Sequence, residues 1–379
     1  MKNIIKLFTA SILVKIMYLV FAAIILKNLS VISFSGYLDL TYRLDSGWYN
    51  KIADNGYPKI TDRYEIGTDR TTIWKQSEWG FFPFYPLMNR TLMKLCNMDF
   101  QRSGFIISIV FSFLSLLGFY KICKLYISDE KKAFYISLIF LLFPFHFHYS
   151  MMYTEAIFFT WLIYAFLAIH HRKYWAVAIL LIPLVLTRAN GIVLLLPLYL
   201  FFLEREGILS KKKFEIKRIF SRDIMIKSLA FTTAPLAFLL YGLYQQHVTT
   251  HFFAYSIAQR GWGRDFMFPL MSFFRKGNFP TQFNSIYVLI VMAYAILIWK
   301  KNAWSWNILI WIGLLFPLCT GTVDAMPRYM SIIFPLFICL GSWIYSKKIN
   351  YVFLVLLAIS QLSVFYLWVV SHPYSWQLI

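Results

Sequence analysis

The sequence predicts an all-α integral membrane protein with about eleven hydrophobic helices and short amphipathic helices in a large first external loop. Its 379 residues are 59% hydrophobic and only 14% charged, whereas soluble domains are about 45–50% apolar and about 25% charged. The apolar residues come in runs that approach the roughly 20 residues needed to cross a bilayer as a helix. These observations exclude a soluble globular protein, and the basic residues between the runs predict the orientation.

Nine apolar runs are expected to form helices, because backbone inside lipid must satisfy its own hydrogen bonds. The first run, 8–26, is followed by no small-residue cleavage site, so we expect a retained helix rather than a removed signal peptide. The remaining runs are 104–120, 133–143, 153–169, 229–244, 283–299, 303–320, 330–346 and 350–370.

The segment 176–203 is long enough for one helix, but both of its flanks are basic. A single crossing would place one of these flanks outside. A V-shaped pair of short helices that turns at 187–191 keeps both flanks inside, and such short arms are tolerated where they line a cavity within the protein. We therefore expect this pair, which brings the count to about eleven and places the C-terminus outside.

Lysine and arginine residues are expected to mark the cytoplasmic side. With the N-terminus inside, the inside loops hold 20 of the 37 basic residues and six acidic ones. The formal net charge of +20 then reports orientation rather than nucleic-acid binding. The basic segment 204–228 either meets anionic lipid headgroups or only marks topology. We expect a single domain over 1–379, with external loops at 28–103 and 247–282.

Asp45 begins an amphipathic stretch in the first external loop, which carries eight acidic residues. Trp48, Tyr49, Ile52 and Ala53 recur at helical spacing, which predicts a helix on the membrane surface with its apolar side down. The helix dipole favours an ionised Asp45 at its N-terminus. Asp45 is therefore either a reactive carboxylate near the bilayer face or a helix cap.

The first loop ends in GFFPFYPL (80–87), which is either a set of interfacial anchors or a wall for a lipid chain or sugar ring. Glu155, Arg188 and Arg328 are charged residues at the external ends of apolar segments. Such groups are costly near hydrocarbon and tend to be paired or functional. An arginine can clamp a phosphate with two donors, while a structural Glu155–Arg188 ion pair is the alternative.

Other kinds of chemistry find little support in the sequence. It contains no GxSxG elbow and no glycine-rich phosphate loop. Its four cysteines are scattered, which predicts neither a disulfide framework nor a metal site. The external histidines have no obvious carboxylate partner for a metal; they are His146, His148, His247 and His251. No inside loop is long enough to fold a nucleotide-binding domain, so a donor substrate is expected to arrive through the membrane.

Five segments resemble motifs of the PIG-V family of membrane mannosyltransferases, in the family's order. RLDSGWYNKIADNGY (43–57) and GFFPFYPL (80–87) resemble its Asp-centred motif and its F-F-P-x-Y-P motif. The later segments resemble its Y-[ST]-E, R-[SA]-N-G and P-R-[YF] motifs; they are MMYTEAIFF (151–159), TRANG (187–191) and PRYMSIIFPLF (327–337).

This resemblance implies a GT-C-class polytopic glycosyltransferase that uses a polyprenyl-phosphate sugar on the non-cytoplasmic face and inverts the anomeric carbon. It implies that Asp45 is the catalytic residue, which we expect to act as a general base. No metal or other cofactor is expected, because cationic side chains can take the charge of the leaving phosphate. The residues expected to bind donor phosphate or substrate are Arg188, Arg328, Glu155, Asn190, Tyr49 and Tyr85.

The chain also departs from the family pattern. It has Leu44 where many members have tryptophan, and a longer, more charged insertion between Tyr57 and Gly80. Its composition suggests an AT-rich bacterium, hence the bacterial cytoplasmic membrane and a lipid-linked or cell-envelope glycan as acceptor. Mannose is the sugar that the family implies. The alternatives are another GT-C transferase or glycan ligase, and a lipid-sugar flippase.

Overall fold

The computed structural model describes residues 2–59, 76–275, 277–347 and 349–370. Most of the charged insertion, with Asp62, Glu65 and Asp69, therefore lies outside the described residues. Within them the regular structure is helical, apart from one isolated β-bridge between Leu209 and Phe214. The first nine α-helices are α1 (Lys2–Leu26), α2 (Phe34–Thr41), α3 (Asp45–Asn55), α4 (Phe84–Cys96), α5 (Phe100–Tyr126), α6 (Glu130–Leu141), α7 (Glu155–His170), α8 (Tyr174–Thr187) and α9 (Leu195–Arg205). The others are α10 (Ile216–Ile219), α11 (Arg222–Ser228), α12 (Thr233–Thr249), α13 (Ala254–Ala258), α14 (Phe279–Ile298), α15 (Trp304–Leu318), α16 (Met326–Tyr329), α17 (Phe334–Tyr345) and α18 (Asn350–Val369).

Several of these helices are long and apolar enough to cross a membrane. Among the described residues five pass this test: α1, α5, α18, Arg222–Thr249 and Phe279–Lys301. A sixth span results if Met326–Ile332 and Phe334–Tyr345, which are bent by 83° relative to each other, are one crossing. Helices α7, α8 and α15 are apolar but shorter. The multi-pass membrane prediction is therefore supported, whereas the count of about eleven is not confirmed.

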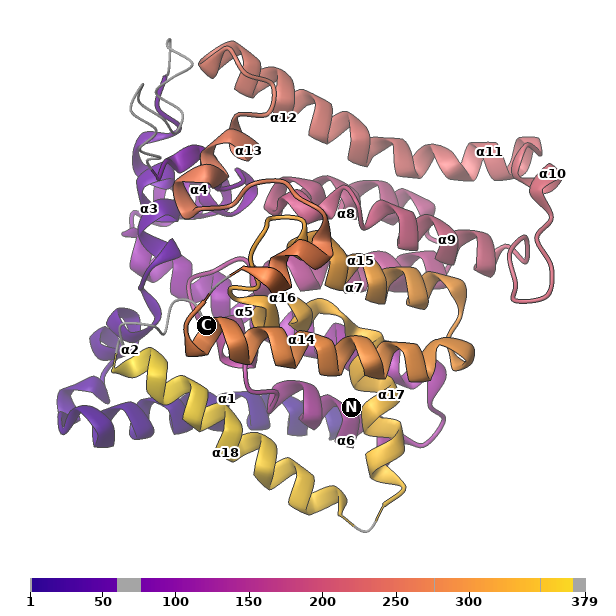
Figure 1. The fold of residues 1–379 in the computed structure, drawn as a ribbon. Helices are drawn as coiled ribbons and strands as arrows, with labels where there is room; N and C mark the ends of the chain where they lie inside the picture. Colours follow the sequence, from indigo (N-terminus) through magenta and orange to yellow (C-terminus); the bar gives the residue numbers. More distant parts are fainter. Residues whose placement is uncertain (1, 60–75, 276, 348, 371–379) are drawn as a thin grey trace.

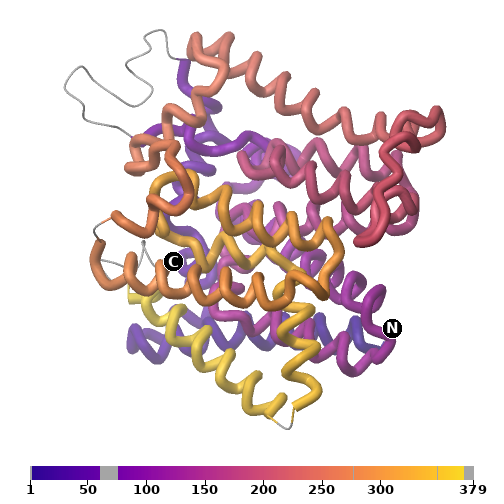
Figure 2. The backbone as a smooth tube through the Cα atoms, turned by 45° about the vertical axis from the view of Figure 1, so that its right-hand side comes forward, coloured from indigo at the N-terminus to yellow at the C-terminus, as the bar shows by residue number. Residues whose placement is uncertain are grey.

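The core of the bundle is built around α7, whose residues are almost all buried. This helix packs against α5 on one side and α8 on another. Both views place α12 along one edge of the molecule and α1 with α18 along the opposite edge (Figures 1 and 2). Helices α2, α3, α4 and α13 gather at one end of the bundle, while the N-terminus and α10 lie at the other (Figure 1). The predicted external and cytoplasmic segments thus occupy opposite ends.

Helix α3 begins at Asp45, but protein covers its apolar face. The side chains of Tyr49, Ile52 and Ala53 are no more than 5% exposed. Helix α4 packs against α3, and Arg90 of α4 donates from Nε and Nη2 to the carbonyls of Ala53 and Ile52 over 2.5 and 2.8 Å. The expected contact between this face and lipid is therefore wrong, because the segment after the insertion folds back over it.

The segment 176–203 forms two helices, α8 and α9, with the expected turn between them. The turn approaches α8 closely, since a Cβ on Gly191 would lie 2.5 Å from the carbonyl oxygen of Leu184. Glycine is therefore required at this point of the TRANG segment. The turn brings Arg188 to the end of the bundle where α3 lies, next to the first residue of α7.

Candidate active site

Four charged side chains from distant parts of the chain form a continuous series of ion pairs. Arg328 lies between two carboxylates: its Nη2 donates to Asp45 Oδ2 over 3.1 Å, and its Nε donates to Glu155 Oε1. Arg188 Nη2 donates to the same Glu155 oxygen over 2.6 Å. The order is Asp45, Arg328, Glu155, Arg188, so the structure brings together four of the predicted site residues in one charge network.

Exposure differs sharply within this charge network. The side chain of Asp45 is 30% exposed, those of Arg188 and Arg328 are 14% and 9% exposed, and that of Glu155 is completely enclosed. Buried charges are tolerated when they are paired and hydrogen-bonded. Solvent therefore reaches the carboxylate of Asp45, while the enclosed carboxylate of Glu155 pairs with both arginines. The predicted Glu155–Arg188 ion pair exists as one link of a longer network.

Asp45 is the first residue of α3, and its side chain faces Arg328 instead of capping the helix. The N-cap position is Leu44, which makes no side-chain cap hydrogen bond and has a φ of 47°, in the left-handed region. A non-glycine residue in that region is uncommon and often marks a functional constraint. The interpretation of Asp45 as a simple helix cap is therefore wrong.

Two contacts hold the start of α3 against the segment that precedes α7. The hydroxyl of Ser46 donates to the carbonyl of Met152 over 3.2 Å, and the hydroxyl of Tyr49 lies 3.4 Å from that of Thr154. Glu155 follows directly as the first residue of α7, where the helix dipole favours a carboxylate. These contacts place the two carboxylates of the network on either side of one arginine.

Arg188 lies between α8 and α9 in extended conformation. Burial opposes its charge, but the adjacent Glu155 carboxylate outweighs this effect and raises the pKa of Arg188. Its guanidinium therefore remains charged at any physiological pH. Asn190 lies in the same turn, and among the described residues its buried Oδ1 has no hydrogen-bond partner. A substrate-binding role for Asn190 stays a prediction.

A third arginine completes a basic cluster around the ring of Tyr329. Arg264 Nη2 donates to the Tyr329 hydroxyl over 3.0 Å. The guanidinium carbons of Arg188, Arg264 and Arg328 lie 5.6, 6.0 and 6.0 Å from the centre of this ring. Together with two carboxylates, three arginines leave one net positive charge, which suits an anionic ligand.

Sequence reasoning missed Arg264 and Tyr329. Tyr329 directly follows Arg328 in the segment 327–337, and this position in the sequence was the signal that could have indicated a place beside the site. Arg264 belongs to the second external loop, in the stretch GWGRD (261–265). An arginine next to a glycine-flanked tryptophan in an external loop is a weak signal, and only the fold brings it to the charge network.

The second external loop docks onto the first through Trp262 and Gln259. The ring of Trp262 lies 5.8 Å from that of Trp48 on α3, and a Cβ on Gly80 would lie only 2.6 Å from it. Gln259 Nε2 donates to the Gly80 carbonyl over 2.9 Å, while its Oε1 accepts from Arg264 Nη1 over 3.0 Å. Arg264 is therefore held by a loop-to-loop contact and by Tyr329 together.

Tyr85 lies in an apolar cluster behind α3. Its side chain is completely buried, and its ring centre lies 4.9 Å from that of Tyr49, which is 5% exposed. Among the described residues the Tyr85 hydroxyl has no hydrogen-bond partner. The structure thus places Tyr85 against Tyr49, which follows Asp45 by four residues on α3, and the role of both tyrosines in substrate binding stays a prediction.

A buried histidine, His148, lies close to the charge network. Burial, reinforced by the Arg328 charge, lowers the pKa of His148 to about 3, so this ring is neutral at pH 7. Its Nδ1 lies 3.0 Å from the Phe145 carbonyl. Over the part of the chain that the structure describes, no group of three or more His, Cys, Asp or Glu side chains could hold a metal ion. The expectation that no metal is needed stays a prediction.

No model of a known protein family matches the chain, and no curated protein matches its sequence. Solved structures do resemble it. The apo oligosaccharyltransferase of Archaeoglobus fulgidus is 13% identical, with a TM-score of 0.50 over 96% of this chain and 56% of that one. The oligosaccharyltransferase AglB of the same organism, in complex with an inhibitory peptide and a dolichol-phosphate, is 11% identical, with a TM-score of 0.46 over 97% and 56%. The complex with Zn and sulfate is 13% identical, with a TM-score of 0.44 over 96% and 53%.

The first of these likenesses shows a shared GT-C-type fold. The chain spans little more than half the length of the proteins it resembles. The predicted helical fold of GT-C type is therefore supported, and the PIG-V resemblance continues to rest on the short motifs alone.

Proposed function

We propose that this protein is a membrane glycosyltransferase that moves a hexose, with mannose favoured, from a polyprenyl phosphate to a lipid-linked or cell-envelope glycan on the external face. The observation that carries the proposal is the charge network, in which the partly exposed carboxylate of Asp45 pairs with Arg328, one of three arginines around the ring of Tyr329. The GT-C-type fold supports membrane glycosyl transfer, and one of the similar structures is a complex with a dolichol-phosphate. The motif resemblance supports mannose.

The arrangement suits a single inverting displacement. The acceptor oxygen attacks the anomeric carbon while the bond from that carbon to the phosphate oxygen breaks. Asp45 takes the proton of the acceptor hydroxyl as a general base. The polyprenyl phosphate departs with its developing charge held by Arg188 and Arg328, with Arg264 at the edge of the site. Because the cations already stand in place, they need little reorganisation during the reaction.

Arg328 has a second effect in this mechanism. In the free protein its guanidinium donates to both Asp45 and Glu155. A donor phosphate competes for the same guanidinium and loosens its contact with Asp45. Donor binding therefore releases the Asp45 carboxylate from Arg328, so that it can accept a hydrogen bond from the acceptor hydroxyl.

The test is transfer of radiolabelled mannose from polyprenyl-phosphate mannose in membranes that contain the protein. Asp45→Asn keeps the shape of the side chain but removes the base, and we expect transfer to fall at least about a hundredfold. The matched control is Asp54→Asn, because Asp54 is an exposed carboxylate at the other end of the same helix. Both variants should reach the membrane in wild-type amounts.

The result that contradicts the proposal is wild-type transfer by Asp45→Asn. A glucose-loaded donor tests the sugar, and a preassembled lipid-linked oligosaccharide tests the glycan-ligase alternative. A flippase would leave the label on the polyprenyl phosphate and change only the leaflet in which it lies. Chelation of divalent metals should leave the rate unchanged.

A further inference from the structure

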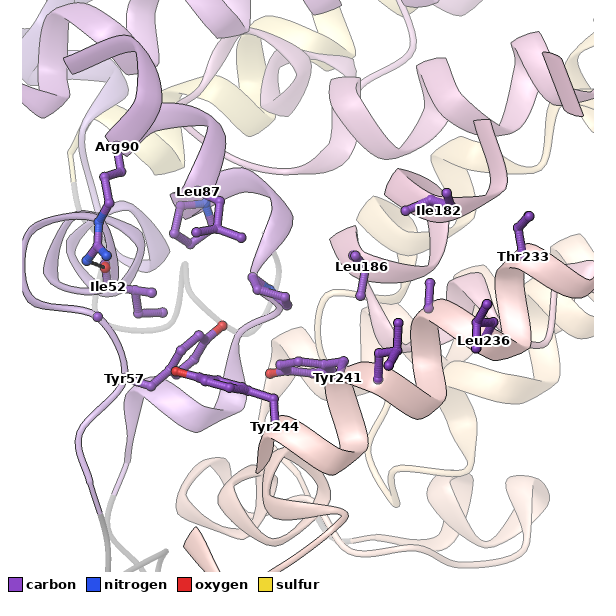
Figure 3. A pocket seen from close by; sticks show the side chains of 15 residues that line it. Ile52, Tyr57, Leu87, Arg90, Ile182, Leu186, Thr233, Leu236, Tyr241 and Tyr244 are labelled. Atoms are coloured by element: carbon purple, nitrogen blue, oxygen red, sulfur yellow. Dashed lines mark hydrogen bonds between the residues drawn. The ribbon is translucent and has the colours of Figure 1, made fainter. Parts of the chain in front are cut away.

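A largely apolar pocket of about 510 Å³ is lined by residues of α3 and α8, the helices next to Asp45 and Arg188 in the chain. One side is made by α3, α4 and the chain next to them, and the other side is made by α8 and α12 (Figure 3). Its size falls within the range of ordinary small-molecule sites. Tyr57, Tyr241 and Tyr244 gather where the two sides meet, and Leu186 and Leu236 project from the two long helices (Figure 3).

Two helices that line the pocket, α8 and α3, also lead to residues of the charge network. Leu186 lines it near the end of α8, only two residues before Arg188. Ile52 lines it on α3, seven residues after Asp45 and therefore about 10 Å along the same helix. A ligand with an anionic head at Arg188 thus has an apolar region within reach of its other end.

The pocket also opens toward the lipid. Leu236 and Leu240 belong to Arg222–Thr249, a stretch apolar enough to span the membrane, and these side chains are 54% and 58% exposed. Among the described residues that line the pocket, Arg90 alone is charged, and it already donates to two carbonyls at the end of α3. Its lining therefore suits a hydrocarbon chain that enters from the bilayer rather than a polar sugar.

We propose that this pocket binds the part of the donor's polyprenyl tail nearest to the phosphate. The inference rests on the proposed function. It adds where the donor's tail binds and from which side of the protein the donor enters. The donor is favoured over a lipid acceptor because the α8 wall leads directly to Arg188, the cation that the donor phosphate needs. The α12 wall is the entrance, since it borders lipid along its exposed leucines.

The experiment compares two donors: mannosyl phosphate carrying a polyprenyl tail and mannosyl phosphate carrying only a methyl group. Ala237→Trp fills the pocket, because Ala237 lines it from α12 and is 7% exposed. We expect this variant to raise the KM for the polyprenyl donor about tenfold or more, with kcat and the KM for the methyl donor nearly unchanged. The control is Leu239→Trp, on an exposed face of α12 outside the pocket.

A second variant covers the case in which Ala237→Trp does not fold. Leu240→Gln changes an exposed lining residue into a polar one, and we expect a smaller increase in the same KM; Leu239→Gln is its control. A polyprenyl phosphate that carries a photoreactive group in its first isoprene units should label α12 peptides, even if it carries no sugar. That arm tests the pocket separately from transfer.

The inference is overturned if the variants change the KM for the acceptor and not for the donor, or if tail length has no influence on the effect of Ala237→Trp. Labelling only outside the segments that line the pocket also overturns it. If the wild-type protein transfers no sugar from any polyprenyl phosphate but the photoreactive lipid still labels α12, the proposed function fails while the lipid pocket stands.

Discussion

Glu155 and Glu206 are buried carboxylates that each lie between two cations, and they lie at opposite ends of the bundle. Glu206, after α9, accepts from Lys227 over 2.8 Å and lies 3.4 Å from Arg172. Glu155 accepts from Arg188 and Arg328. Both glutamates are themselves well buried, with side-chain exposures of 7% and zero. The difference lies in their cationic partners.

Water reaches the cations around Glu206 but hardly those around Glu155. Arg172 and Lys227 are 62% and 27% exposed, whereas Arg188 and Arg328 are 14% and 9% exposed. Exposed pairs contribute little to stability, while a buried charge that loses its partner is very unfavourable. The ion pairs of Glu206 at the predicted cytoplasmic end should therefore contribute little to stability. The buried network of Glu155 should be needed both for stability and for the chemistry of the site.

Of the substitutions that test this difference, Glu155→Gln should have the largest effect on stability and on sugar transfer. It leaves two buried guanidinium groups without their shared carboxylate, so we expect a loss of about 3–5 kcal/mol of stability and transfer below detection. Thermal unfolding in detergent, with a transfer assay on the same preparation, measures both. The matched control is Glu204→Gln, because the Glu204 carboxylate accepts from the amide and hydroxyl of Ser305 rather than from cations.

A Glu155→Gln variant with normal thermal stability would contradict the hypothesis that Glu155 stabilises the fold by pairing with two buried arginines. If stability fell but transfer survived at wild-type specific activity, Glu155 would be structural alone. Adding Arg188→Gln to Glu155→Gln should restore part of the lost stability, because it removes one unpaired charge.

The sequence predicted which residues belong to the charge network, but not which of them contact one another, apart from the Glu155–Arg188 pair. Glu155, Arg188 and Arg328 stood out because ionisable residues are costly at the ends of apolar segments. Asp45 stood out because it begins an amphipathic stretch in the first external loop. The start of α3 at Asp45 and the turn around Arg188 also followed from periodicity and flanking charge. Each of these signals is local, which is why it can be read from a chain with no alignment.

The remaining features depend on contacts between distant segments. Asp45 and Arg328 are separated by 283 positions, and no periodicity records that they meet. Periodicity showed that one face of α3 is apolar but could not show that α4 covers it. Arg264 could not be assigned, because its place depends on how Trp262 packs against Trp48 and Gly80.

Arg264 is the intermediate case in this comparison, since it is half-buried and reaches the site from a loop. We expect Arg264→Gln to raise the KM for the polyprenyl donor about tenfold, because one charge-assisted hydrogen bond to phosphate is lost, with less than about a threefold change in kcat. Arg264→Lys should recover part of the affinity. Arg260→Gln is the control, because Arg260 lies in the same loop and pairs with the exposed Asp265 over 2.9 Å. Equal effects of Arg264→Gln and Arg260→Gln would show that only the loop matters.

Lys227→Met should have the smallest effect, although it breaks ion pairs with both Glu206 and Asp223. We expect a loss of about 1 kcal/mol or less at pH 7, since water and Arg172 still solvate Glu206.

Burial opposes the ionisation of Glu206, but hydrogen bonds from Lys227 and Tyr174 lower its pKa below the usual 4.5. A depressed carboxylate pKa stabilises the folded state above the unfolded pKa, and this contribution is lost as pH falls through the folded value. The difference between wild type and Lys227→Met should therefore shrink below about pH 4.5, as thermal unfolding at a series of pH values can show. A loss as large as that of Glu155→Gln would mean that exposure of the cationic partners does not separate the two ends of the molecule.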